Sequence, residues 1–187
     1  YTEAEDFEIL LFAYCFDDEE IQIVDLASGE KLPDEVVDAL TDSEIIKTAF
    51  NAQFERTCLA KHLKTPMPPE QWRCSMAHAL TLGLPTSLAG VAKCLKLTNQ
   101  KMKEGKALIR YFSLPCRPTK ANGKRTRNLP CHDKEKWETF KTYCIKDVEV
   151  ERQIRKRLEH YPMTEKEQRL WVLDQQMNDH GVLVDKN

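Results

Sequence analysis

Two short motifs in the chain carry oxygen-bearing side chains that could act on a phosphodiester. Tyr143 and Asp147 are four residues apart in a helix-compatible run, so a helix would place the hydroxyl and the carboxylate on one face. Glu55 supplies a second carboxylate at the end of the segment 51–55. Hard cations such as Mg²⁺ take oxygen ligands, and two such ions about 4 Å apart can activate water and stabilise a leaving oxygen. Together the motifs indicate a metal-dependent nuclease.

Each side chain has a candidate role and a structural alternative. Glu55 and Asp147 are the candidate metal ligands, and Tyr143 could hold the attacking water by a hydrogen bond without ionising at neutral pH. Either motif alone arises often by chance. In the alternative, Tyr143 packs at the edge of the core and the carboxylates form ion pairs with basic neighbours, namely Lys146 or Arg152 for Asp147 and Arg56 or Lys61 for Glu55.

The N-terminal elements follow from the spacing of apolar residues. The apolar run 9–16 and the β-branched run 21–26 flank the acidic segment 17–20, a pattern typical of a β-hairpin. Pro33 then opens a predicted helix, because proline is tolerated at the first helical position. The residues expected to face inward from that helix are Val36, Val37 and Leu40.

The segment around Glu55 is predicted to run from strand to helix. Residues 45–50 form an apolar run typical of a buried strand, and helical spacing follows over 54–63. The junction between a strand and the next helix is where open α/β sheets build their sites. The residues expected on the inner face of this helix are Phe54, Cys58, Leu59 and Leu63.

A long helix is predicted to carry Tyr143 and Asp147. Asp133 is a plausible N-cap, and Pro162 stops the helix after about Tyr161. Tyr143 and Asp147 would lie beside its core stripe, which consists of Trp137, Phe140, Cys144 and Val148. Further helices are predicted over 76–82, over 88–95 with Ser87 as N-cap, and over the tail to about His180.

The composition is that of an ordinary globular protein of one domain. Of the 187 residues, 41% are hydrophobic and 31% charged, and no apolar run approaches the roughly 20 residues that span a bilayer. The 7 cysteines form no C-x-x-C pair, so we expect reduced thiols, a cytoplasmic location and no membrane role. Because the chain begins at Tyr1 without a signal peptide, we expect an excised piece of a larger protein.

Charge is distributed unevenly along the chain. Residues 1–50 hold 15 Asp/Glu and 2 Lys/Arg, whereas residues 93–127 hold eleven basic residues and one acid, Glu104. Such a basic stretch could contact phosphates, or it could be a solvated loop whose charges keep it in water. Its prolines and Gly123 indicate a loop. The candidate phosphate-contacting residues are Lys106, Arg110, Lys124, Arg125 and Arg127.

Four segments in order, 51–59, 72–80, 87–92 and 143–147, resemble the proofreading 3′–5′ exonucleases of the DEDD superfamily. The likeness spans nearly the whole chain and is greatest to the exonuclease domain of family A DNA polymerases of the phage and prophage kind. It implies an α/β, ribonuclease H-like fold in which helices flank a mixed central sheet. It also implies the tyrosine-bearing branch of the superfamily.

The resemblance assigns roles residue by residue. Glu55 stands at the second-motif carboxylate, and Asn51 precedes it by the family's spacing as a nucleic-acid-binding residue. Tyr143 and Asp147 form the third motif. The implied cofactors are two Mg²⁺ or Mn²⁺ ions, and the implied partner is the 3′ end of single-stranded DNA.

The chain departs from the family pattern at three positions. The first motif, Asp-x-Glu on an opening strand, has no equivalent, because the acids at 3–6 lie too close to the predicted hairpin. We therefore expect the fold to lack its first strand, with an unpaired sheet edge and possible self-association. Glu55 replaces the usual aspartate and is one methylene longer. Cys74 stands where relatives often have an acid.

These observations predict an exonuclease domain over 1–161 and, over 162–187, the start of the connection to a polymerase domain of the same parent chain. The fragment itself is expected to be inactive, since its site is incomplete. One alternative is a non-catalytic DNA-binding or scaffolding domain with a relict nuclease fold. Another is a ribonuclease D-type exonuclease that acts on RNA.

Overall fold

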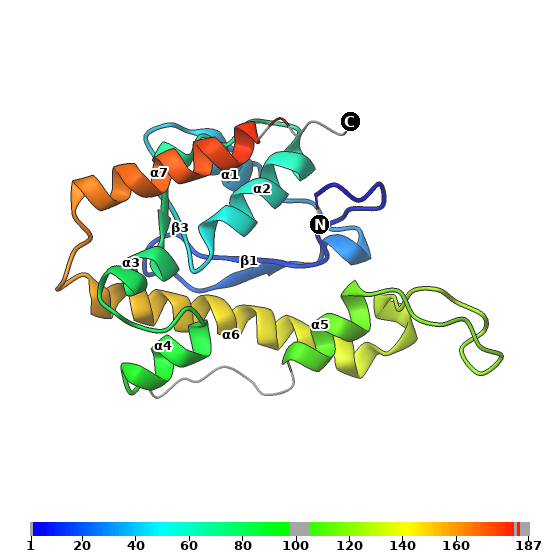
Figure 1. Cartoon of the computed structure of the whole chain (residues 1–187). Coiled ribbons are helices and arrows are strands. Elements are labelled where there is room, and N and C mark those ends of the chain that lie inside the picture. Colours follow the sequence, from blue (N-terminus) through cyan, green and yellow to red (C-terminus); the bar gives the residue numbers. More distant parts are fainter. Residues whose placement is uncertain (1, 98–104, 182, 184–187) are drawn as a thin grey trace.

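The computed structural model describes residues 2–97, 105–181 and 183. Short strands lie in the middle of the molecule between two groups of helices (Figure 1). One group consists of α1 (Asp34–Thr41), α2 (Ala52–Leu63) and α7 (Glu165–His180). The other consists of α3 (Ser75–Thr81), α4 (Leu88–Cys94), α5 (Gly105–Ser113) and the long α6 (Lys134–Leu158). The expected α/β class is confirmed.

The strands form two separate pairs. β1 (Phe12–Tyr14) and β2 (Gln22–Val24) pair antiparallel, which confirms the predicted hairpin with shorter strands. β3 (Lys47–Ala49) and β4 (Trp72–Cys74) pair parallel. Within the described residues these pairs do not join into the single mixed central sheet that the resemblance implied. Each of these strands therefore keeps one edge without a strand partner.

The predicted buried strand over 45–50 is wrong in extent and in burial. Ile45 and Ile46 are 39% and 50% exposed, whereas Lys47 is buried. Lys47 can be buried because its Nζ donates hydrogen bonds to the carbonyl oxygen of Asp42 at 2.5 Å and to Oε1 of Gln71 at 2.9 Å. Burial lowers the pKa of Lys47, against the charge of Asp42. The hydrophobic pattern predicted that the isoleucines would be buried in this strand, but the hydrogen-bonded Lys47 is buried instead.

Several predicted helix ends are confirmed by their caps. The Asp133 carboxylate accepts a hydrogen bond from the Lys136 N–H at the start of α6, and the Ser87 hydroxyl accepts one from the Gly90 N–H at the start of α4. Helix α7 ends at His180 as expected. Pro33 is the N-cap residue of α1 and not its first helical residue.

Helix α6 contributes to two of the three hydrophobic clusters among the described residues. Its first half packs against α5, with Trp137, Phe140 and Tyr143 in contact with Leu108 and Phe112. Its second half packs against α3 and α4 through Val150, Ile154 and Leu158. The third cluster joins α1, α2 and β4, and Trp171 of α7 packs against it. No helix within the described ranges is long and apolar enough to span a membrane.

Two ionic contacts, each with one buried partner, connect elements that are distant in the sequence. Arg56 of α2, 4% exposed, forms two hydrogen bonds of 2.7 Å with the Asp179 carboxylate of α7. Asp25, which follows β2, accepts a hydrogen bond of 2.7 Å from Nε1 of Trp137 and lies 3.1 Å from Nζ of Lys141. Since an unpaired buried charge is costly, each contact holds its element firmly in place.

Candidate active site

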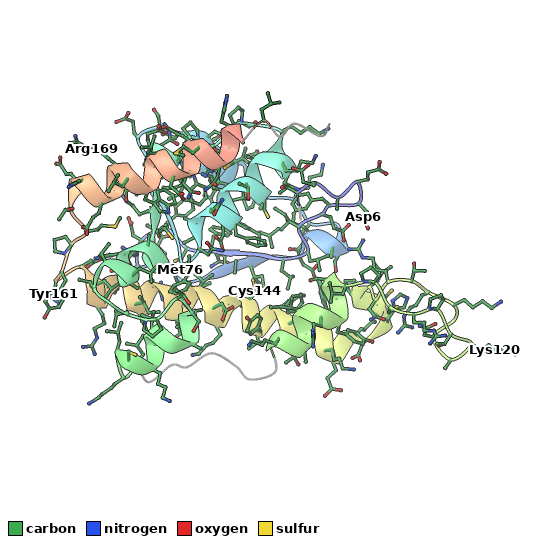
Figure 2. The ribbon with its side chains drawn as sticks, viewed as in Figure 1. Asp6, Met76, Lys120, Cys144, Tyr161 and Arg169 are labelled. Atoms are coloured by element: carbon green, nitrogen blue, oxygen red, sulfur yellow. The ribbon has the colours of Figure 1, made fainter. Side chains whose placement is uncertain are left out.

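The Cys144 thiol of α6 lies close enough to Glu55 of α2 and to Asp147 of α6 for both charges to act on it. Burial raises its pKa to about 11, and the charges of Asp147 and Glu55 both add to the increase. Figure 2 places Cys144 near the middle of α6. Glu55 of α2 and Asp147 of α6 therefore both lie in the neighbourhood of Cys144, a region that we call the acidic centre.

The Glu55 carboxyl lies in an environment that disfavours its charge. Burial and the nearby Glu151 charge together raise its pKa to about 7, against a hydrogen bond from its own backbone. Its Oε2 atom is buried and accepts no hydrogen bond from the described residues. An orphaned carboxylate oxygen of this kind is stabilised by a proton or by a bound cation.

Glu151 is a buried carboxylate that the sequence reasoning missed. It lies one helical turn after Asp147 on α6 and is 8% exposed. The Ser75 hydroxyl at the start of α3 donates a hydrogen bond of 2.5 Å to its Oε1. Burial raises its pKa, while this hydrogen bond and the charge of Arg155 oppose the increase. The spacing of four residues from Asp147 was the available signal.

Tyr143 is both packed in the core and close to Asp147. Its side chain is 4% exposed, and its ring is stacked on that of Phe140 with centroids 6.2 Å apart. Burial raises the pKa of the hydroxyl above its usual range, and hydrogen bonding to Asp147 raises it further. The hydroxyl therefore stays protonated at neutral pH. The packed position that the sequence left as an alternative is confirmed, together with the predicted proximity to Asp147.

The basic neighbours proposed as ion-pair partners bind elsewhere. Lys146 pairs with Glu149 at 2.7 Å, and Arg152 donates a hydrogen bond to the backbone carbonyl of Glu19. Arg56 pairs with Asp179. These three basic side chains therefore have partners other than the two candidate metal ligands.

At the start of α2, the expected burial of Phe54 is wrong, and the expected role of Asn51 stays a prediction. Phe54 is 46% exposed rather than buried, because the helix begins at Ala52 and its buried face runs through Ala52, Arg56 and Leu59. Asn51 is the exposed N-cap residue, and its side chain makes no capping hydrogen bond. Its amide remains available for the predicted nucleic-acid contact.

The carboxylate oxygens of Glu55 and Asp147 are the kind of ligand that a hard divalent cation binds. Oε2 of Glu55, which has no hydrogen-bond partner among the described residues, could bind such a cation. Within the part of the chain that the structure describes, however, no three His, Cys, Asp or Glu side chains are grouped closely enough to hold a metal ion. The described residues therefore fit part of a cation site, with Glu55 and Asp147 as its candidate ligands.

The basic stretch is not one loop. Residues 105–113 form the helix α5, which carries the exposed Lys106 and Arg110, and the loop follows over 114–129. The loop prediction was wrong for α5 because the prolines and the glycine used as evidence all lie after it. Lys101 and Glu104 lie outside the described residues.

The loop itself divides its basic residues between solvent and protein. Lys124 is exposed. Arg125 donates a hydrogen bond to Oδ1 of Asn128 at 2.9 Å, and Arg127 forms an ion pair with Glu8. In Figure 2 the loop carries Lys120 at its outer end, away from Cys144. The two arginines are thus engaged within the protein, and the loop extends away from the acidic centre.

The fold and the site define an α/β domain in which partly buried carboxylates of α2 and α6 lie near one thiol, that of Cys144. The chain is 64% identical, over 185 residues, to a DNA polymerase of Bacillus phage SP02. This match covers 99% of the chain and 28% of that polymerase, so the chain is homologous to a segment of a phage DNA polymerase. No family model matches the chain, and no solved structure matches it.

Proposed function

We propose that this chain is the 3′–5′ exonuclease segment of a DNA polymerase and takes part in proofreading during replication. The observation that carries the proposal is that Tyr143 lies beside Asp147 on α6, while the charges of Asp147 and of Glu55 from α2 both act on the thiol of Cys144. The 64% identity to a segment of a phage DNA polymerase supports it. So does the order of the motifs, which resembles a proofreading exonuclease of ribonuclease H-like fold.

The proposed chemistry is hydrolysis of a DNA phosphodiester that releases nucleoside monophosphates. Bound Mg²⁺ or Mn²⁺ would supply Lewis-acid stabilisation of the developing charge, with Glu55 and Asp147 as ligands. The chain's own residues have separate tasks. Tyr143 keeps its proton at neutral pH and can orient a water molecule by hydrogen bonding. The low dielectric around Glu55 strengthens every charge interaction at the centre.

The substrate is the 3′ end of single-stranded DNA. Lys106, Arg110 and Lys124 are exposed basic side chains that can neutralise phosphates, whereas Arg127 would first have to leave its ion pair with Glu8. Lys106 and Arg110 are the better placed of these, since α5 packs on the half of α6 that contains Tyr143. In this proposal residues 162–187 lead toward the polymerase domain.

The test uses the full-length polymerase that contains this segment. A 3′-labelled single-stranded DNA is incubated with Mg²⁺ or Mn²⁺, and Asp147→Asn is compared with Asp38→Asn, which changes an exposed aspartate on α1. We expect degradation by wild type and the control, and none by Asp147→Asn. Equal degradation by all three would remove Asp147 from the site.

A second candidate is a DNA-binding or scaffolding domain with a relict site. The absence of a three-ligand group within the described residues favours it. It predicts DNA binding by the full-length protein without 3′ degradation, and no effect of Asp147→Asn. A matched RNA strand in the same assay tests the ribonuclease alternative.

A further inference from the structure

Gly105, the first residue of α5, lies directly against the ring of Tyr143. A Cβ built on Gly105 would be 2.5 Å from Cδ2 and from Cζ of Tyr143 and closer still to Cε2. Real Cβ atoms essentially never approach other atoms so closely, so any larger residue must displace the ring or the helix.

Backbone conformation does not require a glycine at this position. The described glycines with positive φ are Gly29, Gly83, Gly123 and Gly181, and Gly105 is not among them. The close approach to Tyr143 is therefore the feature that alanine could not reproduce.

The Tyr143 ring is packed among neighbouring side chains. It is 4% exposed and lies in the same cluster as Leu108 and Phe112 of α5. Phe140 is stacked beside it with an angle of 12° between the ring planes. A displaced ring would carry its hydroxyl away from the Asp147 carboxylate, with which it now interacts.

We propose that Gly105 is a positioning residue of the nuclease site. Because it has no side chain, α5 can pack closely against Tyr143, and this packing holds the tyrosine hydroxyl beside Asp147. The exposed Lys106 is the next residue of α5. This inference rests on the proposed function, because it assigns Gly105 a role through Tyr143.

The experiment measures degradation of 3′-labelled single-stranded DNA and the melting temperature of the full-length polymerase. It compares wild type, Gly105→Ala, Tyr143→Phe, Tyr143→Ala and the two double variants. Gly105→Ala should lower the degradation rate on the order of 100-fold, as expected for a misplaced catalytic group. In the Tyr143→Phe background it should lower the rate no further, because the hydroxyl is already gone.

The melting temperatures should depend on the Tyr143 ring and not on its hydroxyl. Gly105→Ala should lower the melting temperature of wild type and of Tyr143→Phe, since both keep the ring that collides with the new methyl group. In Tyr143→Ala it should not, because the ring is absent. Gly90→Ala is the matched control, as its Cβ would also be crowded, but by Ser87 and Pro85 of the α4 region. Its effects should add to those of both Tyr143 substitutions.

The outcomes separate the two proposals. If Tyr143→Phe degrades DNA as fast as wild type, the role of Tyr143 in the proposed function fails. If Tyr143→Phe is slow and Gly105→Ala is as fast as wild type, the inference fails alone. If Gly105→Ala slows degradation equally in the wild-type and Tyr143→Phe backgrounds, Gly105 acts on packing only and the positioning role is overturned.

Discussion

Arg56 and Asp179, 123 residues apart in the chain, form a pair of parallel hydrogen bonds, both 2.7 Å long, between a guanidinium and a carboxylate. The arginine is 4% exposed and also donates a hydrogen bond to the backbone carbonyl of Met67. Arg56 adjoins Glu55 in α2. The last helix of the described structure is therefore fastened to the helix that supplies a candidate metal ligand.

We expect Asp179→Ala to destabilise the protein by about 1.5–3 kcal/mol, because the buried Arg56 loses two charge-assisted hydrogen bonds to a carboxylate that is itself 40% exposed. Urea unfolding followed by circular dichroism measures the change. Glu165→Ala is the control, since its pair with Arg169 is exposed and such pairs contribute about 0–1 kcal/mol. Similar destabilisation in both variants would mean that the pair of Arg56 and Asp179 stabilises the fold no more than an exposed ion pair does.

The raised pKa of Glu55 makes stability depend on pH. The folded protein holds the Glu55 proton up to a pKa of about 7, whereas the ordinary pKa of the group is 4.5. Stability is therefore greatest below pH 4.5 for this group and falls as pH rises toward 7, by on the order of 2–3 kcal/mol. Melting temperatures of metal-free wild type and Glu55→Gln across this range test it. Glu55→Gln should flatten the slope and Glu35→Gln, an exposed control on α1, should not.

The exposed basic residues should determine the salt dependence of DNA binding. Replacing Lys106, Arg110 or Lys124 by alanine should weaken binding and reduce the slope of log K against log salt, by about 0.7 for each single-strand phosphate that is no longer neutralised. Fluorescence anisotropy with a labelled oligonucleotide measures this. Arg127→Ala should change the slope less, because Arg127 is paired with Glu8. A larger effect of Arg127 would contradict the assignment.

Asp25 should contribute to stability at neutral pH and lose that contribution in acid. Its burial is outweighed by hydrogen bonds from Trp137, Lys141 and Ser28, which lower its pKa below 3.8. The contribution is present above pH 3.8 and is lost as pH falls through the lower folded value. We expect Asp25→Ala to cost about 2–4 kcal/mol at pH 7 and clearly less at pH 2. Urea unfolding at the two pH values would show no such difference if the charge were unimportant.

Because its strands have unpaired edges, we expect the isolated 187-residue chain to self-associate. Each described strand pairs on one side only, and unpaired edges are templates for pairing with another chain. Light scattering should give a mass that rises with concentration. The full-length polymerase is the comparison, and a concentration-independent monomer of the isolated chain would contradict the expectation.

Local signals predicted most of the described elements. The Asp133 and Ser87 caps, the turn acids between the hairpin strands and the i, i+4 spacing of Tyr143 and Asp147 depend on neighbouring residues, so they could be found in the sequence. Burial of charged residues could not. Lys47, Arg56 and Glu151 are buried because distant groups hydrogen-bond to them. Helix α5 was missed because its basic surface and the prolines beyond it obscured its apolar face, Leu108 and Phe112.

Helix α6, which packs into two clusters, should also be the slowest part of the molecule to exchange its amide hydrogens. Neither cluster can open without exposing one half of this helix, so the amides at its centre should exchange only in global unfolding. Helix α7, whose outer face exposes Leu170, Leu173 and Met177, should exchange through a smaller opening in which it detaches alone. The candidate site residues Tyr143 and Asp147 would then lie on the most persistent element of the fold.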